Sequence, residues 1–141
     1  MIYAILIFSI ILSFVMLTDE VDEDSISIKS GYGDKHIRDV IKYFSFALTA
    51  SILICMLMLS LAGVIMIPIY AAMRFAFFNR WLNIELGNDK CYLSDRGWDK
   101  FYKSLIPNCE VREFIEYSVV VATGVASFFL AQWLDTISFV A

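Results

Sequence analysis

Apolar positions along the chain gather in three long blocks, separated by two polar segments. The first block runs from Met1 to Leu17 and contains Ser9 and Ser13 as its only polar residues. The second block, residues 44–73, is 30 residues long and contains no charged residue. A helix needs about 20 consecutive apolar residues to cross a bilayer. The pattern therefore predicts an all-α integral membrane protein.

We expect three transmembrane helices, at residues 1–17, 44–67 and 117–141. The first is at the lower limit of spanning length. It lacks a basic leading region and a small-x-small cleavage site, so an uncleaved span is favoured over a signal peptide. A helix lying in the membrane interface is the alternative. The polar segments between the spans are an acidic loop at 18–43 and a helical segment at 68–116.

The part of the second apolar block that follows Pro68 has a different pattern from the part before it. Proline tends to kink or end a helix, and residues 69–86 then form an amphipathic sequence. Asn79, Arg80 and Asn83 share one side of a helical wheel, and aromatic residues cover the other. This pattern predicts a helix lying in the membrane interface. A helix packed on a partner subunit is the alternative.

A second short helix is expected after the stop signal Gly87-Asn88. It would carry an apolar face at the i, i+3, i+4, i+7 positions, and Asn108 could cap the helix that follows it. The polar segment should thus form a compact aromatic cap on the membrane or on a neighbouring protein. The candidate interfacial or partner-binding residues are Phe75, Phe78, Arg80, Trp81, Trp98, Phe101, Tyr102 and Asp135.

Small residues recur at helical spacing in two of the expected spans. Such residues allow the backbones of helices in lipid to approach closely. These faces could pack on each other within one chain, or on other subunits. The candidate helix-packing residues are Ala47, Ser51, Cys55 and Gly63 in the second span, and Ser118, Ala122, Gly124 and Ala126 in the third.

The distribution of charge predicts an orientation in the membrane. Residues 18–42 carry seven acidic and four basic side chains, and residues 74–116 carry seven of each. Lysines and arginines in short loops favour the cytoplasmic side, while acids have little effect. We therefore expect the N-terminus and residues 74–116 on the cytoplasmic or matrix side of a cell or organelle inner membrane. Residues 18–42 and the C-terminus would lie opposite.

Two cysteines bear on the same orientation. Cys91 and Cys109 both lie in the second polar segment, whereas Cys55 lies within a span as a small packing residue. The pair would stay reduced in the cytoplasm and could form a disulfide in an oxidising compartment. Such a disulfide would overturn the orientation given above. No further cysteine or histidine accompanies the pair, so a metal site is not favoured.

Few residues could carry chemistry. Asp135 is the one ionisable residue inside an expected span, and such a residue raises a functional hypothesis. Its place near the interface, beside Trp133, favours solvation there over ion or proton handling or a salt bridge to a partner. His36 is the only histidine and lies in a polar segment, which argues against a haem-anchoring subunit. The sequence has no recognisable catalytic set of residues, so we expect no enzyme activity and no cofactor. The basic residues alternate with acids, so we expect no nucleic-acid partner.

The sequence favours a non-catalytic accessory subunit that docks in a larger membrane protein assembly. Its expected partners are the lipid bilayer and other membrane protein subunits, or further copies of itself. One alternative is a self-assembling pore or channel component, such as a phage holin or a genome-delivery channel. Another is a membrane immunity or exclusion protein.

Overall fold

The computed structural model describes residues 2–31, 36–58, 60–93 and 97–138. The described part is helical, with turns between the elements. Four of its helices are long and apolar enough to cross a membrane, judged by length and composition. The elements, in chain order, are α1 (Ile2–Lys29), α2 (His36–Met58), the 3-10 helix η1 (Leu61–Ile65), α3 (Met66–Glu85), α4 (Gly97–Leu105) and α5 (Cys109–Ser138).

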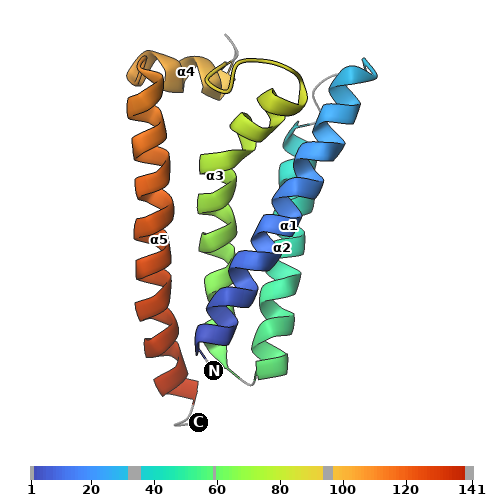
Figure 1. Cartoon of the computed structure of the whole chain (residues 1–141). Coiled ribbons are helices and arrows are strands. Elements are labelled where there is room, and N and C mark those ends of the chain that lie inside the picture. Colours follow the sequence, from blue (N-terminus) through green and yellow to red (C-terminus); the bar gives the residue numbers. More distant parts are fainter. Residues whose placement is uncertain (1, 32–35, 59, 94–96, 139–141) are drawn as a thin grey trace.

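The four long helices run up and down in chain order (Figure 1). At one end of the bundle, α1 and α3 finish, α2 and α5 begin, and the short α4 lies across the top. We call this the polar end. At the opposite end, the apolar end, α1 begins, α5 finishes and η1 leads from α2 into α3.

Helix α3 is the centre of the bundle, since α1, α2 and α5 all contact it. In the candidate span Leu61–Glu85, which comprises η1 and α3, 56% of the most apolar 18 residues are buried, against 11% in α5. Fully buried Tyr70 and nearly buried Phe78 lie on this helix. The interfacial helix expected at 69–86 is therefore the core helix of the fold, because its aromatic residues pack on neighbouring helices of the same chain.

The expectation of three spans is not confirmed, because the second apolar block forms a helical hairpin. Helix α2 ends at Met58, and Ser60 has an extended backbone (φ −143°, ψ 135°). The Ser60 hydroxyl accepts a hydrogen bond from the Ala62 amide and caps η1. Pro68 was expected to kink or end a helix. It lies instead in the first turn of α3, where a missing backbone donor is tolerated.

A close backbone approach holds this hairpin together. A Cβ atom added at Gly63 would lie 2.7 Å from the Cys55 amide nitrogen and 2.8 Å from its Sγ. The Ser51 hydroxyl donates to the Gly63 carbonyl at 3.1 Å. A glycine facing a small residue thus allows η1 to fold back onto α2, as small residues do in membrane helices.

The expected acidic loop at 18–43 is mostly helical. Helix α1 continues without a break to Lys29, and α2 begins at His36. The buried positions Ser9 and Ser13 are followed by Glu20 and Asp24 on the continuing helix. Three acidic residues of this helical extension, Asp19, Glu20 and Glu23, bond to side chains of other helices. These contacts hold the extension of α1 against α2 and α3.

The chain between α3 and α5 is fixed by several bonds. Gly87 adopts a left-handed conformation (φ +72°) where α3 stops, as the Gly87-Asn88 signal predicts. Asn108 caps α5 as expected, since its Oδ1 accepts from the Glu110 amide at 2.8 Å. Cys91 and Cys109 form a disulfide with a Cα–Cα distance of 5.8 Å, so the pairing that the sequence left open is present.

Candidate functional site

A buried ion pair joins α1 to α3 near the polar end. The Glu20 side chain is completely buried, and its carboxylate lies 2.7 Å from Arg74 Nη2. Arg74 Nε also donates to Glu20 Oε1 at 2.8 Å, and the Tyr70 hydroxyl donates to Oε2 at 2.8 Å. The Arg74 guanidinium lies 4.6 Å from the centre of the Phe78 ring. The carboxylate is thus surrounded by donors, as a buried charge requires.

A second ion-pair cluster joins α3 to α5. Arg80 contacts Glu113 at 2.6 Å and Glu116 at 2.8 Å, and both carboxylates come from the first turns of α5. The Tyr102 hydroxyl of α4 donates to Glu116 at 3.3 Å. Burial, followed by the charge of Glu116, raises the pKa of Tyr102 to about 12. Arg80 therefore connects α3 to the start of α5 rather than facing lipid headgroups.

Helices α1 and α2 are also joined at the polar end. The Tyr43 hydroxyl donates to Asp19 at 2.8 Å, and Lys42 pairs with Glu23 at 2.6 Å. The Lys42–Glu23 pair is partly exposed, unlike the pair formed by Glu20. Basic and acidic groups from both polar segments thus bond to one another within the chain.

These contacts bear on the expected orientation. Residues 18–42 and 74–116 were expected on opposite sides of the membrane. Because Glu20 binds Arg74, and because α1 and α3 finish at the same end of the bundle, the two segments lie together (Figure 1). The opposite-side placement is not supported by this arrangement.

The predicted partner-binding aromatic residues fall into two groups. Phe78 and Tyr102 are buried, and Trp81 is half-buried in contact with Phe14 and Phe77. Phe75 is 37% exposed and Phe101 is 51% exposed. The side chain of Trp98 lies outside the described residues. Most of the expected docking face on α3 is therefore used inside the chain.

The two small-residue faces have different surroundings. On α2, Ala47 and Ser51 are buried, and Cys55 lies against Gly63, so this face packs within the chain. On α5, the expected face is turned outward. Ser118, Ala122 and Ala126 are exposed, whereas Gly124 is half-buried with no atom within 4 Å of an added Cβ. Helix α5 instead buries Ser127 and Ala131.

Asp135 has a partner at the apolar end. Its carboxylate accepts a hydrogen bond from the Ser60 hydroxyl at 2.9 Å. Ser60 also caps η1, so Asp135 ties the end of α5 to the hairpin turn. Asp135 therefore holds Ser60 at the start of η1, a contact that the sequence did not predict.

The sequence analysis missed Glu20 as a core residue. The signal that could have found it is periodicity: Ser9, Ser13, Leu17, Glu20 and Asp24 follow one another at spacings of three or four and are all buried. This spacing marks one face of a helix. The run of acids at 19–24 hid that face, because acidic clusters usually belong to solvated loops.

The chemistry of the described residues is that of ion pairs and hydrogen bonds between helices. Within those residues, no group of three His, Cys, Asp or Glu side chains could hold a metal ion. Comparison with protein-family models, with curated proteins and with solved structures finds no match.

Proposed function

We propose that this protein is a non-catalytic accessory subunit that docks against another helical membrane protein through the outer face of α5. The observation that carries the proposal is the exposed stripe Ser118, Ala122 and Ala126. Small residues at this spacing allow a second helix to approach closely in lipid. No helix in the described part of the chain covers them.

The surroundings of this stripe support helix packing. Exposed apolar side chains flank it, with Val125 54% and Phe129 62% exposed. The Ser118 hydroxyl donates to the Phe114 carbonyl of its own helix at 2.7 Å. The face is thus apolar, narrow and free of unpaired charge, which suits van der Waals packing between helices.

The alternative of a self-assembling pore has less support. A water-filled pore needs a polar face directed away from the rest of the chain. The exposed hydroxyls of Ser45 and Thr49 on α2 bond to carbonyls of their own helix. The hydroxyl-bearing residues Ser9, Ser13 and Ser51 are buried. These arrangements favour contact with lipid or with another helix.

We further propose that the polar end faces an oxidising compartment. A disulfide forms and persists where thiols are oxidised, and Cys91–Cys109 lies at this end. The lysines and arginines, all of which fall within residues 29–112, would favour the opposite orientation. We give the disulfide more weight, because disulfides are rare where thiols are kept reduced, whereas the distribution of lysines and arginines is a statistical bias.

The test compares assemblies extracted from the native membrane in mild detergent. Ala122→Leu and Ala126→Leu place bulk on the proposed face, and Ala4→Leu makes the same change at an exposed position of α1. The wild type and Ala4→Leu should migrate in a native gel as a complex larger than one chain, and the two α5 variants should not. Migration of the wild type as a single chain would overturn the proposal. A complex containing only copies of this chain would make the partner a second copy.

A further inference from the structure

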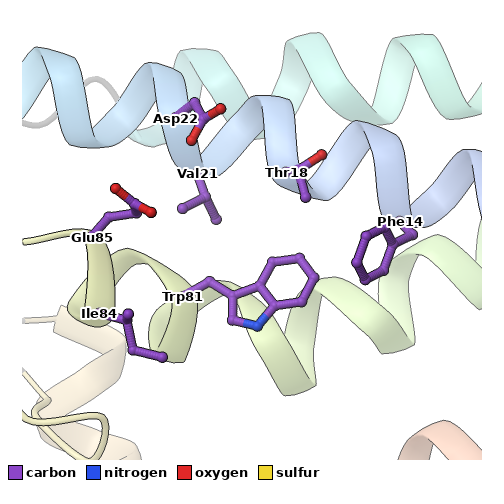
Figure 2. A pocket seen from close by; sticks show the side chains of 7 residues that line it. All are labelled: Phe14, Thr18, Val21, Asp22, Trp81, Ile84 and Glu85. Carbon is purple, nitrogen blue, oxygen red and sulfur yellow. The ribbon is translucent and has the colours of Figure 1, made fainter.

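A groove of about 340 Å³ opens between α1 and α3 (Figure 2). Helix α5 contributes no residue to its lining. Phe14, Thr18, Val21 and Asp22 line it from α1, and Trp81, Ile84 and Glu85 line it from α3. Its volume is within the range of small-molecule sites, about 300–1,000 Å³.

The groove is apolar at one end and acidic at the other. The Phe14 ring meets the Trp81 indole edge-on, with ring centres 5.0 Å apart. Figure 2 shows Asp22 on α1 level with Val21, and the Glu85 carboxylate on α3 farther from Phe14 than either of them. Glu85 is the last residue of α3, so the acidic end of the groove lies at the polar end of the bundle.

The two carboxylates differ from the other acids nearby. Glu20, Glu23 and Asp19 bond to side chains of neighbouring helices. Asp22 and Glu85 have no hydrogen bond or ion pair from their carboxylates to any described residue, and both are exposed. Lys42, Arg74 and Arg80, which lie near the polar end, are paired with other acids.

We propose that this groove binds an amphipathic organic monocation, with its cationic group at the end that Asp22 and Glu85 line and its apolar part against Trp81 and Phe14. Charge complementarity selects a cation at the acidic end. The Trp81 indole and the remaining lining favour an aromatic or aliphatic group at the other end. A membrane-interface groove with this polarity matches a molecule that partitions into the bilayer with its charge at the surface.

A free monocation fits better than the headgroup of a zwitterionic lipid. In such a headgroup the ammonium is attached to a phosphate. The phosphate would lie beside two unpaired carboxylates and be repelled by them. The proposal does not depend on docking through α5, because no residue of α5 lines the groove.

The test uses the full chain in dodecyl maltoside, with radiolabelled tetraphenylphosphonium as the probe in equilibrium dialysis. We expect saturable binding of one cation per chain. Tetraphenylborate, an anion of the same shape, should show no saturable binding. These two measurements need no variant, so they test the proposal even if a substitution disturbs folding. Binding should also weaken in 1 M NaCl, which screens charges.

Variants then locate the site. Asp22→Asn and Glu85→Gln should each weaken tetraphenylphosphonium binding about two- to fivefold, as loss of one exposed charge contact does. Trp81→Leu should weaken it about tenfold, because the aromatic contact is lost, and Trp81→Phe should retain part of the affinity. Glu110→Gln removes an exposed acid outside the groove and should leave binding unchanged.

Three results would overturn the proposal. The first is binding that does not saturate, or equal saturable binding of tetraphenylborate. The second is a loss with Glu110→Gln as large as that with Asp22→Asn and Glu85→Gln. The third is displacement of the probe by equimolar phosphatidylcholine, which would assign the groove to a lipid headgroup. Assembly defects in the α5 variants would have no bearing on these results.

Discussion

Arg74 of α3 and Glu20 of α1 form a buried ion pair across a sequence separation of 54 residues. The Glu20 side chain has no exposure and that of Arg74 has 15%. The pair joins the two polar segments of the chain and fixes α1 against the central helix. A charge that would be costly in lipid is thereby neutralised inside the bundle.

Glu20→Gln should strongly destabilise the fold, because it leaves the Arg74 guanidinium buried without its counter-charge. Loss of one partner of a buried pair costs about 3–5 kcal/mol. The measurement is unfolding in mixed micelles as the fraction of sodium dodecyl sulfate rises.

Two variants serve as controls for this loss. Lys42→Gln breaks the partly exposed pair with Glu23 and should cost less than about 1 kcal/mol. The double variant Glu20→Met, Arg74→Met removes both charges and should be more stable than Glu20→Gln, since an apolar pair can replace a buried ion pair. Equal losses for Glu20→Gln and Lys42→Gln would refute the role of the buried pair.

Gly63→Ala should destabilise the hairpin by about 1–3 kcal/mol, as overpacking of a close contact does. The new methyl group would collide with the Cys55 backbone nitrogen, which cannot move without displacing α2. Gly124→Ala is the matched control, since nothing lies within 4 Å of its added Cβ. In the single chain it should be neutral or stabilising by about 0.5–1 kcal/mol, because alanine favours the helix. A reversed order of the two variants would contradict the described turn.

The apolar blocks sufficed to predict helices that are long and apolar enough to cross a membrane, but not the number of such helices. Residues 44–73 form parts of two helices, and the turn at Ser60 lacks the proline or paired glycines that usually mark one. Arg74 and Arg80 were assigned to the second polar segment, outside any span, because their partners, Glu20, Glu113 and Glu116, are distant in sequence. A charge inside an apolar helix is recognised as a core residue only when its partner is known.

Local signals at the helix ends were more reliable than the long-range ones. Gly87 and Asn108 act within a few residues of their own position, and the structure has them as expected. The outward direction of Ser118, Ala122 and Ala126 could not be predicted, because spacing defines a helix face and not what covers it.

The Cys91–Cys109 disulfide predicts a specific thiol count. The denatured, unreduced chain should show one reactive thiol, Cys55, and three after reduction. Cys91→Ser should lower the free energy of unfolding by about 3 kcal/mol, as expected for a closed loop of this length. Cys55→Ser is the control for thiol counting and should leave no thiol before reduction. Three reactive thiols in unreduced protein from its native membrane would contradict the bridge.

The burial of Tyr102 beside Glu116 predicts a loss of stability at alkaline pH. The pKa of Tyr102 is raised from its ordinary value of 10.0 to about 12. A group whose pKa is raised on folding contributes stability that is fully present below the unfolded value and is lost as pH rises toward the folded value. Wild type should therefore be more stable than Tyr102→Phe at pH 8, and the difference should shrink between about pH 10 and 12. A difference that stays constant across this range would argue against the shift.

The central claim is that the chain crosses the membrane four times, with both polar segments on one side. Cysteine labelling from each face of oriented vesicles tests this claim most directly. The background is Cys55→Ser, in which Cys91 and Cys109 remain bonded. Single cysteines replace Lys29 and Lys100 at the polar end, and Leu61 and Ile137 at the apolar end; all four residues are exposed. A membrane-impermeant maleimide should label Lys29→Cys and Lys100→Cys from one side, and Leu61→Cys and Ile137→Cys from the other. Labelling of Lys29→Cys and Lys100→Cys from opposite sides would restore three spans and contradict the four-helix arrangement.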